Sequence, residues 1–370
     1  MASKNKHLIL WLVGFLVLIC SVTTLSIILL MDSTPITLKT EQQWLHLSLN
    51  SSMSEAPGNE GLVMDPVDSP PLTSDVVDGI NRAADDDQIQ SLLVEINGLA
   101  IGWSQAESLR NALSRFVAAD KPCTAWAEGY DTKSYYVASA CSTVGISPEG
   151  LPLVTGMNIT QSYFAGTLEM LDVRANFEHV GDFKSAVEPY ERTEPSAAAA
   201  QATNALLDSL YDHITQAIAS TRGIGHDEII ALIDDPPITA QDAVERRLID
   251  ERIYRGDLLE RMKDDGEKVR GSQYLMESDR TWGGTGIIAV VHADGPIVSG
   301  KGGPDMFGDN VVGSRSLVKT LGDLADDESI DAVVLRVNSP GGSGMASDDI
   351  WHAIEELKQE KPIVASMGDY

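Results

Sequence analysis

Cysteine and histidine are scarce in this sequence. Its 370 residues include three cysteines and seven histidines, and they form no Cys-x-x-Cys pair and no Cys/His cluster. Structural zinc sites are built from such clusters, so we expect no metal and no other cofactor. Cys123 and Cys141 lie in apolar surroundings, whereas Cys20 lies in an apolar run near the N-terminus. We expect Cys123 and Cys141 to be buried free thiols; a disulfide outside the cytoplasm is the alternative.

Basic residues are also few. The chain has 27 Lys and Arg against 55 Asp and Glu, a formal net charge of −28. The first 31 residues carry two lysines and no acid, so the remaining 339 residues carry −30. This charge disfavours binding to nucleic acid and to anionic lipid surfaces. We therefore expect no nucleic-acid partner. The excess of acidic residues is consistent with either a solvated surface or an electrostatic field that serves the function.

Charge is absent from one long segment, Leu8–Met31, which has 24 residues. At about 1.5 Å per residue, a helix of this length spans about 36 Å and can cross a bilayer with some tilt. Lys4 and Lys6 precede it, which places the N-terminus in the cytoplasm. The alternative, a cleaved signal peptide, has an apolar core of only about 7–15 residues. We therefore expect residues 1–31 to form a cytoplasmic N-terminus and transmembrane anchor, and residues 32–42 a linker.

The rest of the sequence contains an internal repeat. At a shift of 241 positions, the acidic turn Asp85–Asp87 matches Asp326–Glu328, and the apolar run Leu92–Ile96 matches Val333–Val337. In both copies, short apolar strands alternate with amphipathic helices, which indicates βαβ units on a mainly parallel sheet. We expect an α/β fold in which Leu92–Ile96 and Val333–Val337 are equivalent buried strands. Ligands on such sheets bind beyond the carboxyl ends of the strands.

These patterns divide the chain after the linker into three parts. Residues 43–170 form a first repeat, residues 171–285 a helical connecting region, and residues 286–370 a second repeat. Within the connecting region, a long helix is expected from Pro195 to near Arg222, with Gly223 as its C-terminal cap.

The segment Asn338–Ser343, with the sequence NSPGGS, directly follows an apolar strand. The glycine pair Gly341 and Gly342 lets backbone N–H groups turn toward one point, and a helix after them adds its dipole. In acyl transfer, such donors hold the oxyanion. An ordinary glycine-rich turn is the alternative.

The second chemical signal is Lys184, in the sequence GDFKSAVEP. Val180, Phe183, Ala186 and Val187 place apolar side chains around it. Burial disfavours an ammonium, and a neutral amine can deprotonate a serine hydroxyl. An exposed lysine on a loop is the alternative.

The segments GDFKSAVEPY, NSPGGS and KPIVASMGDY, in this order along a two-copy chain, resemble the long, duplicated form of the signal peptide peptidase A (protease IV) family. The segment TAQDAVERRLIDERI at 239–253 resembles the "GLVDxIG"-type segment shared across the Clp protease/crotonase fold. The resemblance implies two tandem Clp/crotonase-like repeats after an N-terminal transmembrane helix.

The resemblance also implies roles for particular residues. Lys184 matches the general base of a Ser/Lys dyad. Gly341 and Gly342 match the oxyanion hole, and Gly342 is the better backbone donor. The nucleophilic serine lies in an "AASGGYY"-like segment of the family, beyond the position of Tyr370. Ser185 and Ser366 match other family positions.

The family resemblance implies a serine endopeptidase that degrades cleaved signal peptides or similar hydrophobic peptides. It implies a homo-oligomer in a bacterial inner (cytoplasmic) membrane, with most of the chain on the periplasmic side. The 370 residues alone are expected to be inactive. The alternatives are a non-catalytic membrane-anchored interaction protein and a crotonase-like acyl-CoA enzyme, which binding of a CoA thioester would favour.

Overall fold

A computed structural model describes residues 42–50, 52–57, 70–276, 286–304 and 310–370, which belong to a single unit. The expected anchor at 8–31 and all but the last residue of the linker lie outside these ranges. Within them, no helix combines the length and the apolar character needed to cross a membrane.

The first half of the chain builds a six-stranded sheet, which we call the N-terminal sheet. Its strand order is β7-β5-β3-β2-β1-β8, and all neighbouring strands pair in parallel. The strands are β1 (Gln43–Leu49), β2 (Ile89–Ile96), β3 (Cys123–Ala127), β5 (Thr143–Ile146), β7 (Glu251–Arg252) and β8 (Glu267–Arg270).

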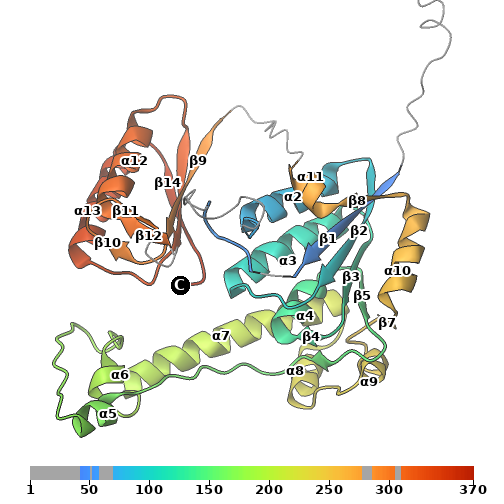
Figure 1. The fold of residues 1–370 in the computed structure, drawn as a ribbon, viewed down its shortest axis with the longest axis horizontal. Coiled ribbons are helices and arrows are strands. Elements are labelled where there is room, and N and C mark those ends of the chain that lie inside the picture. Colours follow the sequence, from blue (N-terminus) through green and yellow to red (C-terminus); the bar gives the residue numbers. More distant parts are fainter. Residues whose placement is uncertain (1–41, 51, 58–69, 277–285, 305–309) are drawn as a thin grey trace, which may run out of the picture. The chain divides into compact units, whose positions relative to one another are not determined.

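Helices cover both faces of the N-terminal sheet, as parallel sheets require. Figure 1 shows α2 (Thr73–Asp85) and α3 (Trp103–Ala118) on one side of the strands and α10 (Arg255–Arg261) on the other. Alternate strand residues face the two sides: Leu45 packs in the cluster that includes α2 and α3, whereas Trp44 packs with α10. All residues of the expected strand Leu92–Ile96 are buried, which confirms that prediction.

The second half builds a smaller C-terminal sheet with the order β14-β13-β9, again parallel. Its strands are β9 (Ile288–Asp294), β13 (Ala332–Asn338) and β14 (Ile363–Met367), with helices α12 (Ser314–Asp326) and α13 (Gly344–Glu360) between them. The helices cover one face, where Val333 and Leu335 are buried. On the other face, Ile288, Val290 and Val364 are 61%, 56% and 62% exposed.

A small three-stranded sheet accompanies the C-terminal sheet. It contains β10 (Ile297–Val298), β12 (Asn310–Gly313) and β11 (Gly302–Pro304), in that spatial order. β10 also forms a bridge to Gly342, so it lies directly beside the glycine pair of the SPGG turn.

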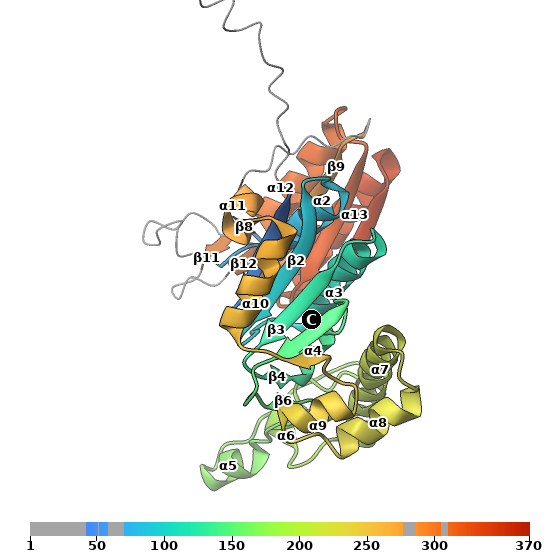
Figure 2. The ribbon, with the colours of Figure 1, turned by 90° about the vertical axis from the view of Figure 1, so that its right-hand side faces the viewer.

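The connecting region is not only helical. It contains the helices α7 (Ala197–Arg222), α8 (His226–Asp234) and α9 (Ala240–Glu245), but its strands β7 and β8 form the two edges of the N-terminal sheet. Both strands are short and mostly polar, so they lack the apolar pattern from which a strand is predicted. Figure 2, which turns the molecule by 90°, shows the strands of the N-terminal sheet running beside α10.

The long helix α7 agrees with the prediction from the sequence. It ends at Arg222, and Gly223 caps it with a left-handed φ of 61°. Its C-terminal half is buried at Ile214 and Ile218, whereas Leu206 in its N-terminal half is 61% exposed. Arg110 fixes the buried half by donating hydrogen bonds to Ala217 O and Thr221 Oγ1.

Cys123 and Cys141 form a disulfide, so the expectation of free thiols is wrong and the alternative holds. The bond joins the first residue of β3 to a residue after α4 (Thr132–Ala138), 18 positions later, where the Cα atoms lie 4.8 Å apart. The sequence could not decide this, because the helix between them determines whether the two Cβ atoms meet.

Candidate active site

The SPGG turn leaves the carboxyl end of β13 and enters α13. Gly341 has a φ of 91°, in the left-handed region that favours glycine. A Cβ at Gly342 would lie 2.1 Å from the carbonyl oxygen of Ile297, so only glycine fits there. Two hydrogen bonds hold the turn against β10: Ile297 N donates to Gly341 O at 2.9 Å, and Ser343 N donates to Ile297 O at 2.9 Å.

The backbone amides of this turn differ in their availability. Gly341 N donates to Ser339 Oγ at 3.1 Å, and Ser343 N is used by β10. Gly342 is exposed, and its amide has no hydrogen-bond partner among the described residues. Since α13 begins at Gly344, the positive end of its dipole lies next to this amide. Gly342 is therefore the better placed of the two glycines to donate to an oxyanion.

A cavity of about 450 Å³ lies beside the turn, at the carboxyl ends of β9 and β13. Its wall includes Pro340 of the turn and the side chains of Asp294, Asn310 and Asn338. The Asp294 carboxylate accepts hydrogen bonds from Asn310 Nδ2 at 2.9 Å and Asn338 Nδ2 at 2.8 Å. Asp294 and Asn310 were not predicted from the sequence; the position of Asp294, a polar residue directly after an apolar strand, was the signal that could have indicated it.

Lys184 lies in a separate part of the chain, residues 155–196, which we call the arm. Its backbone N–H donates to Gly181 O at 3.3 Å, and Lys184 itself is exposed. The apolar surroundings expected around it are not present within one chain, since Val180 and Phe183 are 96% and 63% exposed. The arm is closed on itself by a stack of Phe164 on Tyr190, with ring centroids 6.1 Å apart.

The arm continues into α7 through a capped start. Ser196 accepts a hydrogen bond from Ala199 N, and Ser196 N donates to the buried carboxylate of Glu188 at 2.9 Å. Lys184 therefore sits on a folded element. Among the described residues, however, no hydrogen bond, ion pair or aromatic contact joins it to Gly341 or Gly342.

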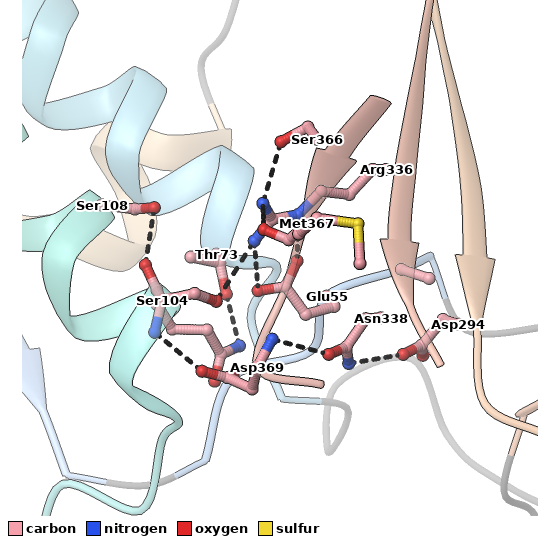
Figure 3. A network of polar contacts seen from close by, with 12 residues as sticks. Glu55, Thr73, Ser104, Ser108, Asp294, Arg336, Asn338, Ser366, Met367 and Asp369 are labelled. Atoms are coloured by element: carbon pink, nitrogen blue, oxygen red, sulfur yellow. Dashed lines mark hydrogen bonds and ion pairs between the residues drawn. The ribbon is translucent and has the colours of Figure 1, made fainter. Parts of the chain in front are cut away.

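A network of polar contacts links the C-terminal sheet to the N-terminal half (Figure 3). Arg336 on β13 pairs with Glu55 through two bonds, Nε to Oε2 at 3.1 Å and Nη2 to Oε1 at 3.2 Å. The Glu55 side chain is 8% exposed and that of Arg336 18% exposed. The pair is partly buried and bidentate, and bidentate pairing is the strong geometry of an arginine–carboxylate contact. This ion pair was not predicted from the sequence.

His292 lies beside this ion pair, opposite Arg336 in the register of β9 and β13. Burial lowers the pKa of His292 below its ordinary value, and Arg336 lowers it further, while Glu55 and Asp294 oppose the shift. Its Nδ1 is buried without a hydrogen-bond partner among the described residues.

We expect the stability of the chain to depend on pH through His292. Because the folded-state pKa is lowered, the unfolded chain takes up the proton first as the pH falls below about 6.5, and stability is lost. The free energy of unfolding, measured in denaturant between about pH 7.5 and pH 5, should fall more steeply for the wild type than for His292→Gln. Parallel curves for the two proteins would contradict a role of His292.

Comparison with known proteins identifies the class to which this α/β fold belongs. Residues 115–270, which include Lys184, match the model of peptidase family S49. The chain is 30% identical to protease 4 of Haemophilus influenzae over 320 residues, which cover 80% of this chain and 51% of that protein. It is 28% identical to protease 4 of Salmonella typhi over 313 residues, covering 80% and 50%.

A plant relative extends the comparison. The chloroplastic serine protease SPPA of Arabidopsis thaliana is 24% identical over 299 residues, which cover 78% of this chain and 44% of that protein. The class is thus the serine-type peptidases of family S49. Within this class, the findings support the protease 4 (signal peptide peptidase A) family, which the motifs of the chain resemble. It spans about half the length of these curated relatives.

Proposed function

We propose that this chain supplies the general base and the oxyanion donor of a membrane-anchored Ser/Lys peptidase. The observation that carries the proposal is the exposed Gly342 amide, which has no partner among the described residues and lies beside a cavity at the carboxyl ends of β9 and β13. In a family of serine-type peptidases, such an amide is suited to bind the oxyanion that forms during acyl transfer.

The proposed reaction uses Lys184 as a neutral amine. Its Nζ takes the proton of a serine hydroxyl while the serine oxygen attacks the scissile carbonyl carbon, and Gly342 N–H stabilises the negative carbonyl oxygen. The resulting ammonium then gives its proton to the leaving amine, which leaves an acyl-enzyme. Water hydrolyses the acyl-enzyme by the same steps, with Lys184 again as the base.

The serine of this reaction is not assigned to any residue of the sequence. Ser366 accepts a hydrogen bond from Arg336 Nη1 at 3.0 Å and belongs to the ion-pair network, and Ser185 lies in the arm. By its resemblance to the family, we assign the nucleophile to a segment that follows the sequence MGDY. In that case the 370 residues carry a base and an oxyanion donor without a nucleophile.

The exposed surface of the arm supports assembly into a homo-oligomer. Met170 and Leu171 are 87% and 67% exposed, in addition to Val180 and Phe183 next to Lys184. Exposed apolar surface of this extent is typical of interaction sites. A second copy that covers this surface would also exclude water from the surroundings of Lys184.

We further propose that the two sheets are tandem Clp/crotonase-like repeats and that the site straddles them. Two parallel series support this: β1-α2-β2-α3-β3 in the first half and β9-α12-β13-α13-β14 in the second. Lys184 follows the first series, and Gly342 lies within the second. Both faces of a parallel sheet are usually covered, so the exposed face of the C-terminal sheet leaves room for a further layer or a partner.

Peptide hydrolysis tests this function. A protein that extends this chain through the region in which its relatives continue should hydrolyse hydrophobic peptides, including synthetic signal peptides, while the 370 residues alone should not. Binding of a CoA thioester without peptide hydrolysis would instead favour an acyl-CoA enzyme.

The topology that we propose places residues 8–31 in a bacterial inner membrane and the following residues in the periplasm. The run of 24 uncharged residues after Lys4 and Lys6 supports it. Protease added to intact spheroplasts should digest the part that follows the anchor, and a cytoplasmic marker protein should survive. If this part is protected until the spheroplasts are lysed, the proposed topology is wrong.

A further inference from the structure

The helix α3 begins without a side chain on its N-cap residue, although Gln105 Oε1 accepts a hydrogen bond of 3.0 Å from Gly102 N. Its N-cap residue is Gly102, which has no side-chain oxygen to accept a bond from the first amides of the helix. The corresponding helix of the C-terminal sheet, α13, has Ser343 as its N-cap residue, and Ser343 Oγ accepts a hydrogen bond from Ala346 N. The two helices thus differ at the position where a cap is needed.

Asp369 supplies the missing cap from the other half of the chain. Its Oδ1 accepts a hydrogen bond of 2.7 Å from Ser104 N, across 265 positions of sequence (Figure 3). A negative oxygen at this point also meets the positive end of the helix dipole. A Cβ on Gly102 would lie 1.7 Å from Asp369 Oδ2 and 1.9 Å from its Cγ, so the carboxylate reaches the helix only because residue 102 is glycine.

The backbone of Asp369 is tied to the candidate site. Asp369 N donates to Asn338 Oδ1 at 3.0 Å, and Asn338 Nδ2 donates to Asp294 Oδ1 at 2.8 Å. Asn338 and Asp294 line the cavity beside the SPGG turn. The cap on α3 is therefore connected through one asparagine to the wall of this cavity.

We propose that Asp369 is a positioning residue: its carboxylate caps α3 and docks the end of β14 on the N-terminal half, which holds Asn338 at the cavity wall. The Arg336–Glu55 ion pair forms a second, partly buried contact between the same two parts. Both contacts lie within the described residues and are independent of the peptidase reaction.

Hydrogen exchange of the 370-residue chain, purified in detergent and followed by mass spectrometry, tests the proposal. In Asp369→Ala, peptides covering 100–106 and 363–370 should exchange about five- to tenfold faster, which is the effect of losing one good cap. The charge-matched control Asp349→Ala, at an exposed position of α13, should leave both peptides unchanged. Unchanged exchange of both peptides in Asp369→Ala would overturn the proposal.

Gly102→Ser separates the cap from the docking. The new hydroxyl can cap α3 itself, but its Cβ occupies the place of the Asp369 carboxylate. Peptide 100–106 should stay protected while peptide 363–370 exchanges faster. Faster exchange confined to peptide 100–106 would show that Asp369 caps the helix without docking β14, and would contradict the proposal.

Chemical rescue adds a readout that a general loss of stability would not produce. Sodium formate should restore the protection of peptide 100–106 in Asp369→Ala, because formate carries the same carboxylate and the space is vacated. Sodium chloride at equal ionic strength should not restore this protection. In the double variant Gly102→Ser/Asp369→Ala, formate should not change the exchange of peptide 100–106. Equal effects of the two salts on Asp369→Ala would overturn recognition of a carboxylate.

Discussion

Replacing Lys184 with arginine should abolish peptide hydrolysis by a protein that carries this chain and the proposed serine. A general base contributes about 10²–10⁴-fold to a rate, so we expect a loss of about a thousandfold or more. Arginine preserves the positive charge and much of the length of lysine, but it stays protonated and cannot accept the serine proton. The measurement is the rate of hydrolysis of a fluorogenic hydrophobic peptide.

Two further variants and one control complete this experiment. Lys184→Ala should be as inactive as Lys184→Arg, whereas Lys184→His should retain at most a trace, because imidazole can be neutral near pH 7 but is shorter. Lys319→Arg, on the exposed surface of α12, should keep full activity, and sedimentation should show unchanged assembly for all variants. Hydrolysis by Lys184→Arg at nearly the wild-type rate would exclude the Ser/Lys mechanism.

Replacing Leu92 with alanine should lower the free energy of unfolding by about 2–5 kcal/mol. Leu92 lies on the central strand β2, is fully buried, and packs in the main core of the N-terminal sheet. Its removal leaves a cavity that the surrounding strands and helices cannot fill completely. Equilibrium unfolding in urea, followed by circular dichroism, measures the loss.

The matched control for Leu92 is Leu206→Ala in the N-terminal half of α7. The same atoms are removed there from a side chain that is 61% exposed, so the expected change is within about 0.5 kcal/mol. Similar losses for Leu92→Ala and Leu206→Ala would mean that β2 is not in the core. A large loss for Leu206→Ala alone would indicate that another chain covers the arm side of α7.

The predictions that agree with the structure rest on local patterns. The apolar run Leu92–Ile96 predicts a buried strand, because a short segment of β-branched and aliphatic residues is typical of a parallel sheet that is covered on both faces. Gly223 predicts the end of a helix, because the residue that follows the last helical turn often adopts the left-handed conformation, which glycine favours. The turn around Gly341 and Gly342 could also be anticipated, since the requirement for glycine arises within a few residues.

The features that were predicted wrongly, or were not predicted, involve residues far apart in the sequence. The disulfide between Cys123 and Cys141 depends on how α4 returns the chain. The strands β7 and β8 are polar, and only their pairing with β5 and β1 makes them strands. The cavity wall at Asp294 requires β9 and β13 to be neighbours in register.

By itself, the sequence determined the α/β class, the positions of the main strands and helices, and the family that the chain resembles. These follow from hydrophobic periodicity and short motifs, which act over a few residues. Only the tertiary structure decided that Lys184 is exposed on the arm, that Gly342 N–H is available, and that Asp369 caps α3. Each of these depends on which surfaces pack together. Packing brings together residues that are far apart in the sequence, so no local sequence pattern indicates the contact.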